Sequence, residues 1–192
     1  MTIRNSPLIL LALGLMMGLL QLLPAEFLAA LEFDRKALGA GQYWRLLSSN
    51  LVHLNGYHWL LNAAGLMLIG FLLRDENRSI SLLLALLWCA TWVGVGLWWL
   101  ADDLDYYRGF SGVLHGLILL APWWSRYLKT SDRWLFLLAL SGKILWEQSP
   151  WFENQQVANM IGGHVETRAH LLGYLAGLAW LALAQFSRWK CR

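Results

Sequence analysis

Residues 79–100 read SISLLLALLWCATWVGVGLWWL, a stretch without a charged side chain. About 20 apolar residues in a helix cross the hydrocarbon core of a bilayer, so this stretch predicts a transmembrane helix. Over the whole chain 58% of the residues are hydrophobic and 14% are charged, whereas about a quarter of the residues of a soluble domain are charged. The composition therefore predicts a membrane protein and excludes a disordered chain.

Five further apolar segments lie before and after this stretch. They cover residues 7–23, 57–73, 111–128, 133–146 and 169–186. We therefore expect an all-α polytopic membrane protein, a bundle of six transmembrane helices in a single domain over residues 1–192, with outer loops at 24–56, 101–110 and 147–168. Arg4 before the first segment would also suit a signal peptide, but the apolar run is long and no convincing small-x-small cleavage site follows Pro24, which favours an uncleaved span.

The basic residues predict an orientation in the membrane. Nine lie in the termini and loops on the amino-terminal side and five in the loops on the opposite side. The more basic side faces the cytoplasm, so both termini are predicted to be cytoplasmic. The net charge of +3 is scattered in short clusters, so no nucleic-acid partner is expected. Cys89 and Cys191 form neither a disulfide framework nor a metal motif.

Polar side chains gather at one depth of the predicted bundle, in its outer half. They lie at the outer ends of the second, fourth and sixth spans: His53, His58, Asn62, Ser111, His115 and His170. Polar groups in a bilayer are costly and mark functional sites. Lys143 is the one cation within a span, and Glu147 one turn later predicts a simple i,i+4 ion pair rather than a proton relay.

Ser111 follows Gly109 and precedes Gly112, so a glycine-flanked turn delivers it to a helix start. A serine there commonly caps the helix. A nucleophile would also benefit, because free N–H groups and the helix dipole stabilise an oxyanion. Position alone leaves both interpretations open.

Two pairs of glycines at small-xxx-small spacing adjoin this serine and the last histidine. They are Gly112 with Gly116 and Gly173 with Gly177. Such pairs allow membrane helices to approach closely. Close packing of these two helices would place the Ser111 hydroxyl beside the His170 imidazole, within reach of proton transfer.

His58 and Asn62 are spaced i,i+4 and therefore share a helix face. Their donors suit an oxyanion, and a structural hydrogen-bonded pair is the alternative. A metal site built on the histidines is a further alternative. We expect neither metal nor cofactor, because no carboxylate or cysteine is spaced to join them and no HExxH or CxxC motif occurs.

Together these residues resemble the motifs of rhomboid intramembrane serine proteases. The resemblance runs from about Gly41 to Gly177 and rests on four motifs in the family order. They are Trp44-Arg45 (the WR element), His53 with His58 and Asn62 (HxxxxHxxxN), Gly109-Phe110-Ser111-Gly112 (GxSG), and Ala169-His170 through Gly173 to Gly177 (AHxxGxxxG). Within the family, the segments at residues 41–47 and 111–116 look like the rhombosortase branch.

Two positions depart from the usual rhomboid pattern. Typical bacterial rhomboids carry a tyrosine that stacks on the catalytic histidine where this chain has His115. His115 could stack, titrate or hydrogen-bond there. A further histidine of the first loop is replaced by Ser49.

The resemblance implies a bacterial inner-membrane enzyme whose active site opens to the periplasmic side. Ser111 would be the nucleophile and His170 the general base, with no acidic third member; His164 in the loop is a weaker candidate base. His58, Asn62 and the backbone N–H of Ser111 would form the oxyanion hole. The loop at 149–168 would be a flexible cap, and the fifth span would flank substrate entry.

The implied substrates are membrane-anchored proteins with a Gly-Gly-containing C-terminal segment, one membrane helix and a basic tail. Glycine destabilises a helix by about 1 kcal/mol, so such a segment can unwind and expose its carbonyl groups. Hydrolysis and transfer to an amine both remain open. The alternative function is that of a catalytically silent relative that binds membrane helices.

Overall fold

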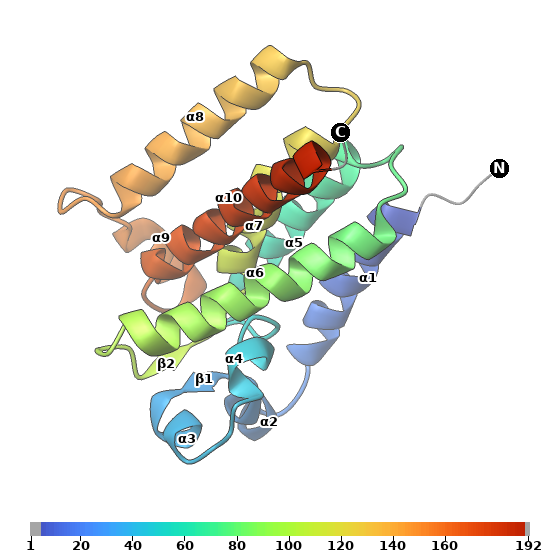
Figure 1. Cartoon of the computed structure of the whole chain (residues 1–192). Coiled ribbons are helices and arrows are strands. Elements are labelled where there is room, and N and C mark those ends of the chain that lie inside the picture. The colour runs from blue at the N-terminus through green and yellow to red at the C-terminus, as the bar shows by residue number, and fades with distance from the viewer. Residues whose placement is uncertain (1–4, 191–192) are drawn as a thin grey trace.

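The computed structural model describes residues 5–190, and side chains as far as residue 184. The elements follow in the order α1 (Asn5–Leu20), α2 (Ala25–Leu31), β1 (Phe33–Asp34), α3 (Arg35–Gly39), α4 (Arg45–Ser48), α5 (Gly56–Leu72), α6 (Ser79–Leu100), β2 (Tyr106–Tyr107), α7 (Ser111–Trp124), α8 (Thr130–Glu147), α9 (Gln155–Ile161) and α10 (Thr167–Lys190) (Figure 1). The predicted helical fold is confirmed. Two-residue strands β1 and β2, which pair antiparallel, are an addition that hydropathy did not indicate.

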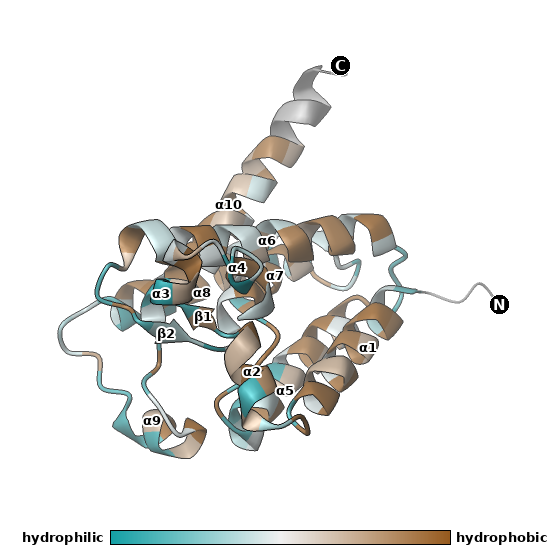
Figure 2. Ribbon diagram, turned by 90° about the horizontal axis from the view of Figure 1, so that it is seen from below, coloured by the Kyte–Doolittle hydropathy of each residue, from teal (hydrophilic) through white to brown (hydrophobic). Residues whose placement is uncertain are grey.

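Each of the six predicted apolar segments corresponds to one long helix, namely α1, α5, α6, α7, α8 and α10. Among the described residues, α6 alone is both long and apolar enough to cross a membrane, while α1, α5 and α7 are apolar but shorter. Large apolar side chains on the outside of the bundle are widely exposed, for example Leu19, Ile80 and Leu135, and Figure 2 shows hydrophobic residues along α1, α5 and α6. This surface suits lipid contact, and the number of crossings stays a prediction.

Helix α7 lies in the centre of the bundle, where α5, α6, α8 and α10 pack around it. Ten of its residues are buried. Helix α8 lies at the edge of the bundle in Figure 1 and contacts α7 and α10. The central position of α7 allows its first residue to meet groups from several helices.

The packing of α7 on α10 is close enough to bring backbone against backbone. A Cβ atom added to Gly112 would lie 2.7 Å from the carbonyl oxygen of Ala169, and one added to Gly116 would lie 2.7 Å from that of Gly173. The predicted role of the paired glycines in close helix packing is therefore confirmed.

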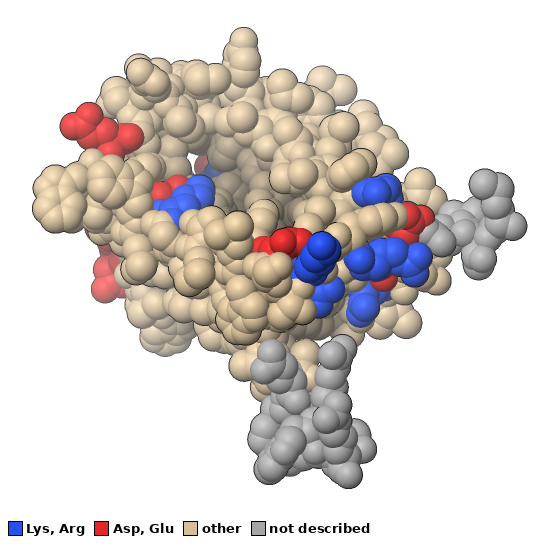
Figure 3. Space-filling view, turned by 90° about the horizontal axis from the view of Figure 1, so that it is seen from above, with Lys and Arg blue, Asp and Glu red and all other residues tan. Residues whose placement is uncertain are grey.

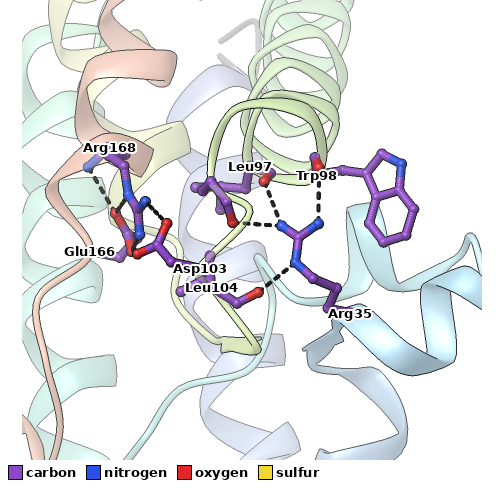
Figure 4. A network of polar contacts seen from close by, with 8 residues as sticks. Arg35, Leu97, Trp98, Asp103, Leu104, Glu166 and Arg168 are labelled. Atoms are coloured by element: carbon purple, nitrogen blue, oxygen red, sulfur yellow. Dashed lines mark hydrogen bonds and ion pairs between the residues drawn. The ribbon is translucent and has the colours of Figure 1, made fainter.

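Hydrogen bonds and ion pairs attach the loops at 24–56 and 101–110 to the end of α6 and the start of α10 (Figure 4). Arg35 donates hydrogen bonds to four carbonyl oxygens at the end of α6 and just after it, those of Leu97, Trp98, Ala101 and Leu104. These bonds satisfy acceptors that a helix C-terminus leaves unpaired. Arg168 forms ion pairs with Glu166 and Asp103, which lowers the pKa of the Asp103 carboxyl. The loops therefore form an ordered rim at this end of the bundle.

The opposite end of the molecule is basic. Arg78 and Arg126, from two different loops, both pair with Glu76, at 3.6 and 3.4 Å. Figure 3 shows basic side chains gathered on the right of the molecule, together with acidic ones. The loops assigned to the cytoplasmic side by sequence therefore meet at one end of the bundle.

Candidate active site

Ser111 and His170 lie side by side at the end of the bundle that carries the loops at 24–56, 101–110 and 147–168. Ser111 is the first residue of α7 and His170 lies in the first turn of α10. The Oγ atom of Ser111 lies 2.9 Å from Nε2 of His170. The close contact between Gly112 and Ala169, the chain neighbours of these two residues, explains the proximity. A hydroxyl and an imidazole in hydrogen-bond contact are the arrangement of an activated nucleophile.

The Ser111 side chain does not cap its helix. Phe110 occupies the N-cap position of α7 and no side chain there accepts a capping hydrogen bond. The first N–H groups of a helix lack partners within the helix, and the helix dipole adds partial positive charge at this end. The start of α7 can therefore stabilise negative charge that develops on a group bonded to Ser111.

A cavity of about 160 Å³ opens beside Ser111. His58, Tyr107 and the segment at 161–166 contribute to its lining, and so does Ser111 itself. The loop predicted to cap the site does border the cavity, and it contains the short helix α9. His164 from this loop lines the cavity, but the hydrogen bond to the Ser111 hydroxyl comes from His170.

His58 presents one ring nitrogen as a donor. Its Nδ1 atom accepts the backbone N–H of Leu54 at 3.4 Å, so the proton of the neutral ring is on Nε2. Gly109 has φ 143°, and a Cβ atom added there would lie 2.9 Å from Nε2 of His58. Gly109 is therefore required both for its backbone conformation and for the space that the imidazole occupies.

Asn62 lies one turn below His58 and is buried. Its amide donates a hydrogen bond of 2.9 Å to the carbonyl oxygen of His58. One of its two N–H groups is therefore committed to the helix itself, and Asn62 is not among the residues that line the cavity.

His115 stacks on His170, with ring centroids 4.2 Å apart and an interplanar angle of 22°. Its Nδ1 atom lies 2.7 Å from the carbonyl oxygen of Ser111. Of the options that the sequence left open for this position, stacking and hydrogen bonding both occur.

His53 is fully buried and contacts the ring of His58 edge to face, with centroids 5.0 Å apart. Neither of its ring nitrogens has a hydrogen-bond partner among the described residues. Burial, with a smaller contribution from His58, lowers the pKa of His53 to about 3. His53 is therefore a neutral support for the His58 ring.

The WR element supports the first outer loop rather than the cavity. Arg45 is buried and donates hydrogen bonds to the carbonyl oxygens of Ala29 and Glu32 at 2.6 and 2.8 Å. Trp44 is exposed and bonds the carbonyl oxygen of Ala30. The two side chains hold the loop against α2.

Glu147 corrects one prediction and confirms another. The expectation of no acidic third member beside Ser111 and His170 is not met, because Oε2 of Glu147 lies 3.0 Å from Nδ1 of His170 and the carboxylate is buried. The predicted i,i+4 ion pair of Lys143 with Glu147 is confirmed at 2.6 Å, and Lys143 also lies 2.8 Å from Nε2 of His115. The i,i+4 spacing predicts the ion pair, but it does not indicate which face of α8 meets α10.

The same carboxylate changes the assessment of a metal site. His115, Glu147 and His170 offer ligand atoms that lie within 4.8 Å of one another, contrary to the expectation that no carboxylate joins the histidines. The ammonium group of Lys143, however, already contacts a lone pair of both His115 and Glu147. A metal ion bound there would have to displace a cation.

The comparisons with known proteins agree with this geometry. A family model described as a Rhomboid domain matches residues 40–185. The matched range contains all the described residues that line the cavity except Glu32. No curated protein matches the chain.

Proposed function

Because the chain belongs to the rhomboid family, we propose that it is an intramembrane serine protease in which Ser111 is the nucleophile and His170 the general base. The family consists in general of serine proteases that act on membrane proteins within the bilayer. The observation that carries the proposal is the 2.9 Å contact between Oγ of Ser111 and Nε2 of His170 beside a cavity. Proton transfer requires this separation.

The first half of the reaction acylates the enzyme. Nε2 of His170 takes the hydroxyl proton as Oγ of Ser111 forms a bond to the scissile carbonyl carbon, and the carbonyl electron pair moves onto oxygen. The C–N bond then breaks when the imidazolium gives its proton to the leaving amine. An ester of Ser111 with the N-terminal part of the substrate remains.

The second half releases this ester. His170 takes a proton from a water molecule, whose oxygen attacks the ester carbon. The Ser111 oxygen leaves with the proton from the imidazolium, so the free enzyme and a carboxylic acid result. If an amine replaces water, the same steps give an amide, as in a sortase-type transfer.

Three groups are suited to the oxyanion in both halves. They are the backbone N–H of Ser111 at the start of α7, the Nε2–H group of His58, a residue that lines the cavity, and the second N–H of Asn62. Donors held in place before the reaction stabilise the developing charge, and each is worth about 10²–10³ in rate.

We propose substrates of the rhombosortase type, in which a Gly-Gly segment precedes a membrane helix and a basic tail. The conformational preference of glycine supports this, because a segment rich in glycine leaves the helical conformation at low cost. Helix α8, at the edge of the bundle, would border the entry of the substrate helix.

The distribution of charge supports a bacterial inner-membrane location with cytoplasmic termini. The basic end formed by Arg78, Arg126 and their neighbours would face the cytoplasm. The site at the other end would then open toward the periplasm, where exported substrates present their Gly-Gly segments.

Reconstitution in liposomes tests the proposal. The substrate is a reporter domain followed by a Gly-Gly segment, one membrane helix and a basic tail, and the variants are Ser111→Ala and, as a matched control, Ser131→Ala at the far end of α8. We expect cleavage by the wild type and by Ser131→Ala, none by Ser111→Ala, and loss of cleavage when Leu-Leu replaces Gly-Gly. Cleavage by Ser111→Ala at the wild-type rate would contradict the mechanism, and a wild type that binds the substrate without reacting with fluorophosphonate would indicate the silent helix-binding alternative.

A further inference from the structure

We propose that Glu147 is a positioning residue that holds the His170 imidazole in its catalytic tautomer, within a closed ring of hydrogen bonds completed by Lys143 and His115. The inference rests on the proposed function. It adds to the serine–histidine pair a carboxylate that the rhomboid resemblance does not supply.

The first part of the ring fixes the protons of His170. Nε2 of His170 must accept the Ser111 hydroxyl, because the serine has to lose this proton to react. The neutral ring then carries its proton on Nδ1, which lies 3.0 Å from Oε2 of Glu147. A carboxylate accepts such a bond, so Glu147 selects the one tautomer that leaves Nε2 free to act as a base.

The second part of the ring fixes the protons of His115 in the same way. A backbone carbonyl can only accept, so the contact of 2.7 Å between Nδ1 of His115 and the Ser111 carbonyl oxygen places the His115 proton on Nδ1. Nε2 of His115 is then an acceptor, and Nζ of Lys143 donates to it at 2.8 Å. The same Nζ donates to Oε1 of Glu147 at 2.6 Å.

The five groups therefore form a ring that starts and ends at Ser111. The sequence of bonds runs from the Ser111 hydroxyl to His170, Glu147, Lys143 and His115 and back to the Ser111 carbonyl. Every donor in this ring meets an acceptor, and one assignment of protons satisfies all five contacts. The members come from α7, α8 and α10, so the ring fixes the base through three helices at once.

The charges of the ring suit the reaction. At rest the carboxylate of Glu147 is balanced by the ammonium group of Lys143. When His170 takes the serine proton it becomes an imidazolium, and its Nδ1–H group still points at the buried carboxylate. An ion pair formed in a site shielded from water is stronger than one in solution, so Glu147 stabilises the state that follows proton transfer. The stacked His115 ring lies neutral against the other face.

A purely structural role for Glu147, as an anchor of α8, makes a different prediction about kinetics. Loss of an anchor would affect folding and substrate binding. Loss of a positioning carboxylate affects the chemical step, since the tautomer and orientation of His170 matter only there. The ratio of the effects on kcat and KM separates the two roles.

The test compares Glu147→Gln with Glu153→Gln, which makes the same chemical change at an exposed loop position. The variants are assayed in liposomes with the Gly-Gly substrate and, independently of substrate, by the rate of Ser111 labelling with a fluorophosphonate. We expect Glu147→Gln to lower kcat and the labelling rate by about 10²–10⁴-fold with KM within about twofold of wild type. Glu153→Gln should match wild type in every measurement.

Lys143→Met is a second variant, which keeps the carboxylate of Glu147 but removes the ammonium group that donates a hydrogen bond to it. It is expected to lower kcat by about tenfold at unchanged KM, and it decides the question alone if Glu147→Gln does not fold, as judged by thermal unfolding in detergent. Two results would overturn the inference if Ser111→Ala still abolished cleavage. One is a kcat for folded Glu147→Gln within threefold of wild type, and the other is a decrease in kcat/KM that comes from a higher KM alone. Wild-type activity in Ser111→Ala would instead refute the proposed function itself.

Discussion

A single methyl group added at the α7–α10 contact should break the hydrogen bond between Ser111 and His170. In Gly112→Ala the new Cβ atom would lie 2.7 Å from the carbonyl oxygen of Ala169, whereas ordinary contact begins at 3.4 Å. The helices must therefore separate by about 0.7 Å (3.4 − 2.7), because backbone rather than a flexible side chain is in the way. Since Gly112 adjoins Ser111 and Ala169 adjoins His170, the same shift lengthens their 2.9 Å contact to about 3.6 Å, beyond hydrogen-bond length.

The expected loss follows from this displacement. A misplacement of about 1 Å between reacting groups can cost about 10²-fold in rate, so Gly112→Ala should lower kcat by about 10–10²-fold. Excess packing of this kind should also reduce the free energy of unfolding by about 1–3 kcal/mol. The assays are cleavage of the Gly-Gly substrate, labelling of Ser111 and thermal unfolding.

Gly142→Ala on α8 is the matched control, because nothing lies within 4 Å of a Cβ atom added there. It makes the same chemical change in a helix and should preserve activity, with equal or greater stability. A Gly112→Ala variant that cleaves and labels at the wild-type rate would refute the argument that close backbone packing sets the Ser111–His170 geometry.

Three further perturbations test other parts of the site. His58→Ala should lower kcat by about 10²–10³-fold with little change in KM, because it removes an oxyanion donor; equal losses in binding and turnover would argue against that role. The pKa of His53 is about 3 in the folded protein and about 6.5 in an unfolded chain. Between these values the unfolded state binds more protons than the folded state. The contribution of His53 to the free energy of unfolding is therefore full above pH 6.5 and is lost as the pH falls toward 3. Between pH 7 and pH 5 His53 should account for about 2 kcal/mol of this loss, and His53→Leu should flatten the dependence of the melting temperature on pH, whereas His164→Leu at an exposed position should not. Arg35→Ala should lower the free energy of unfolding by about 2–3 kcal/mol, since four carbonyl oxygens lose a charged donor; Lys36→Ala, at the exposed neighbouring position, is its control and should leave the melting temperature unchanged.

Hydropathy and glycine spacing were sufficient to locate most of the framework. Apolar runs predicted the six long helices, because a helix that faces lipid or the bundle core needs an apolar surface. The paired glycines indicated the α7–α10 contact. The ends of the helices were less predictable: α8 begins at Thr130 and ends at Glu147, outside the apolar core of the run, because polar residues at helix ends face the rim and not lipid.

The contact of Glu147 with His170 could not be predicted from the sequence. The spacing of Glu147 from Lys143 was visible, but the side chain meets His170 only because of the rotation and tilt of α8 against α10, which depend on packing across the bundle. The hydrogen bonds of Arg35 to the end of α6 could not be predicted from the sequence for the same reason, since their acceptors are backbone carbonyl oxygens of residues distant in the sequence. Contacts between segments distant in the sequence depend on how the helices pack, so they leave no pattern in the local sequence.

The most direct test of the central claim is a double-mutant cycle on Ser111 and His170. The rates of substrate cleavage are measured for Ser111→Ala, His170→Ala and the double variant, each confirmed as folded. If the two side chains act as one unit, each single variant should lose as much kcat/KM as the double variant. Losses that multiply, so that the double variant is far slower than either single one, would contradict a shared reaction between the serine and the histidine.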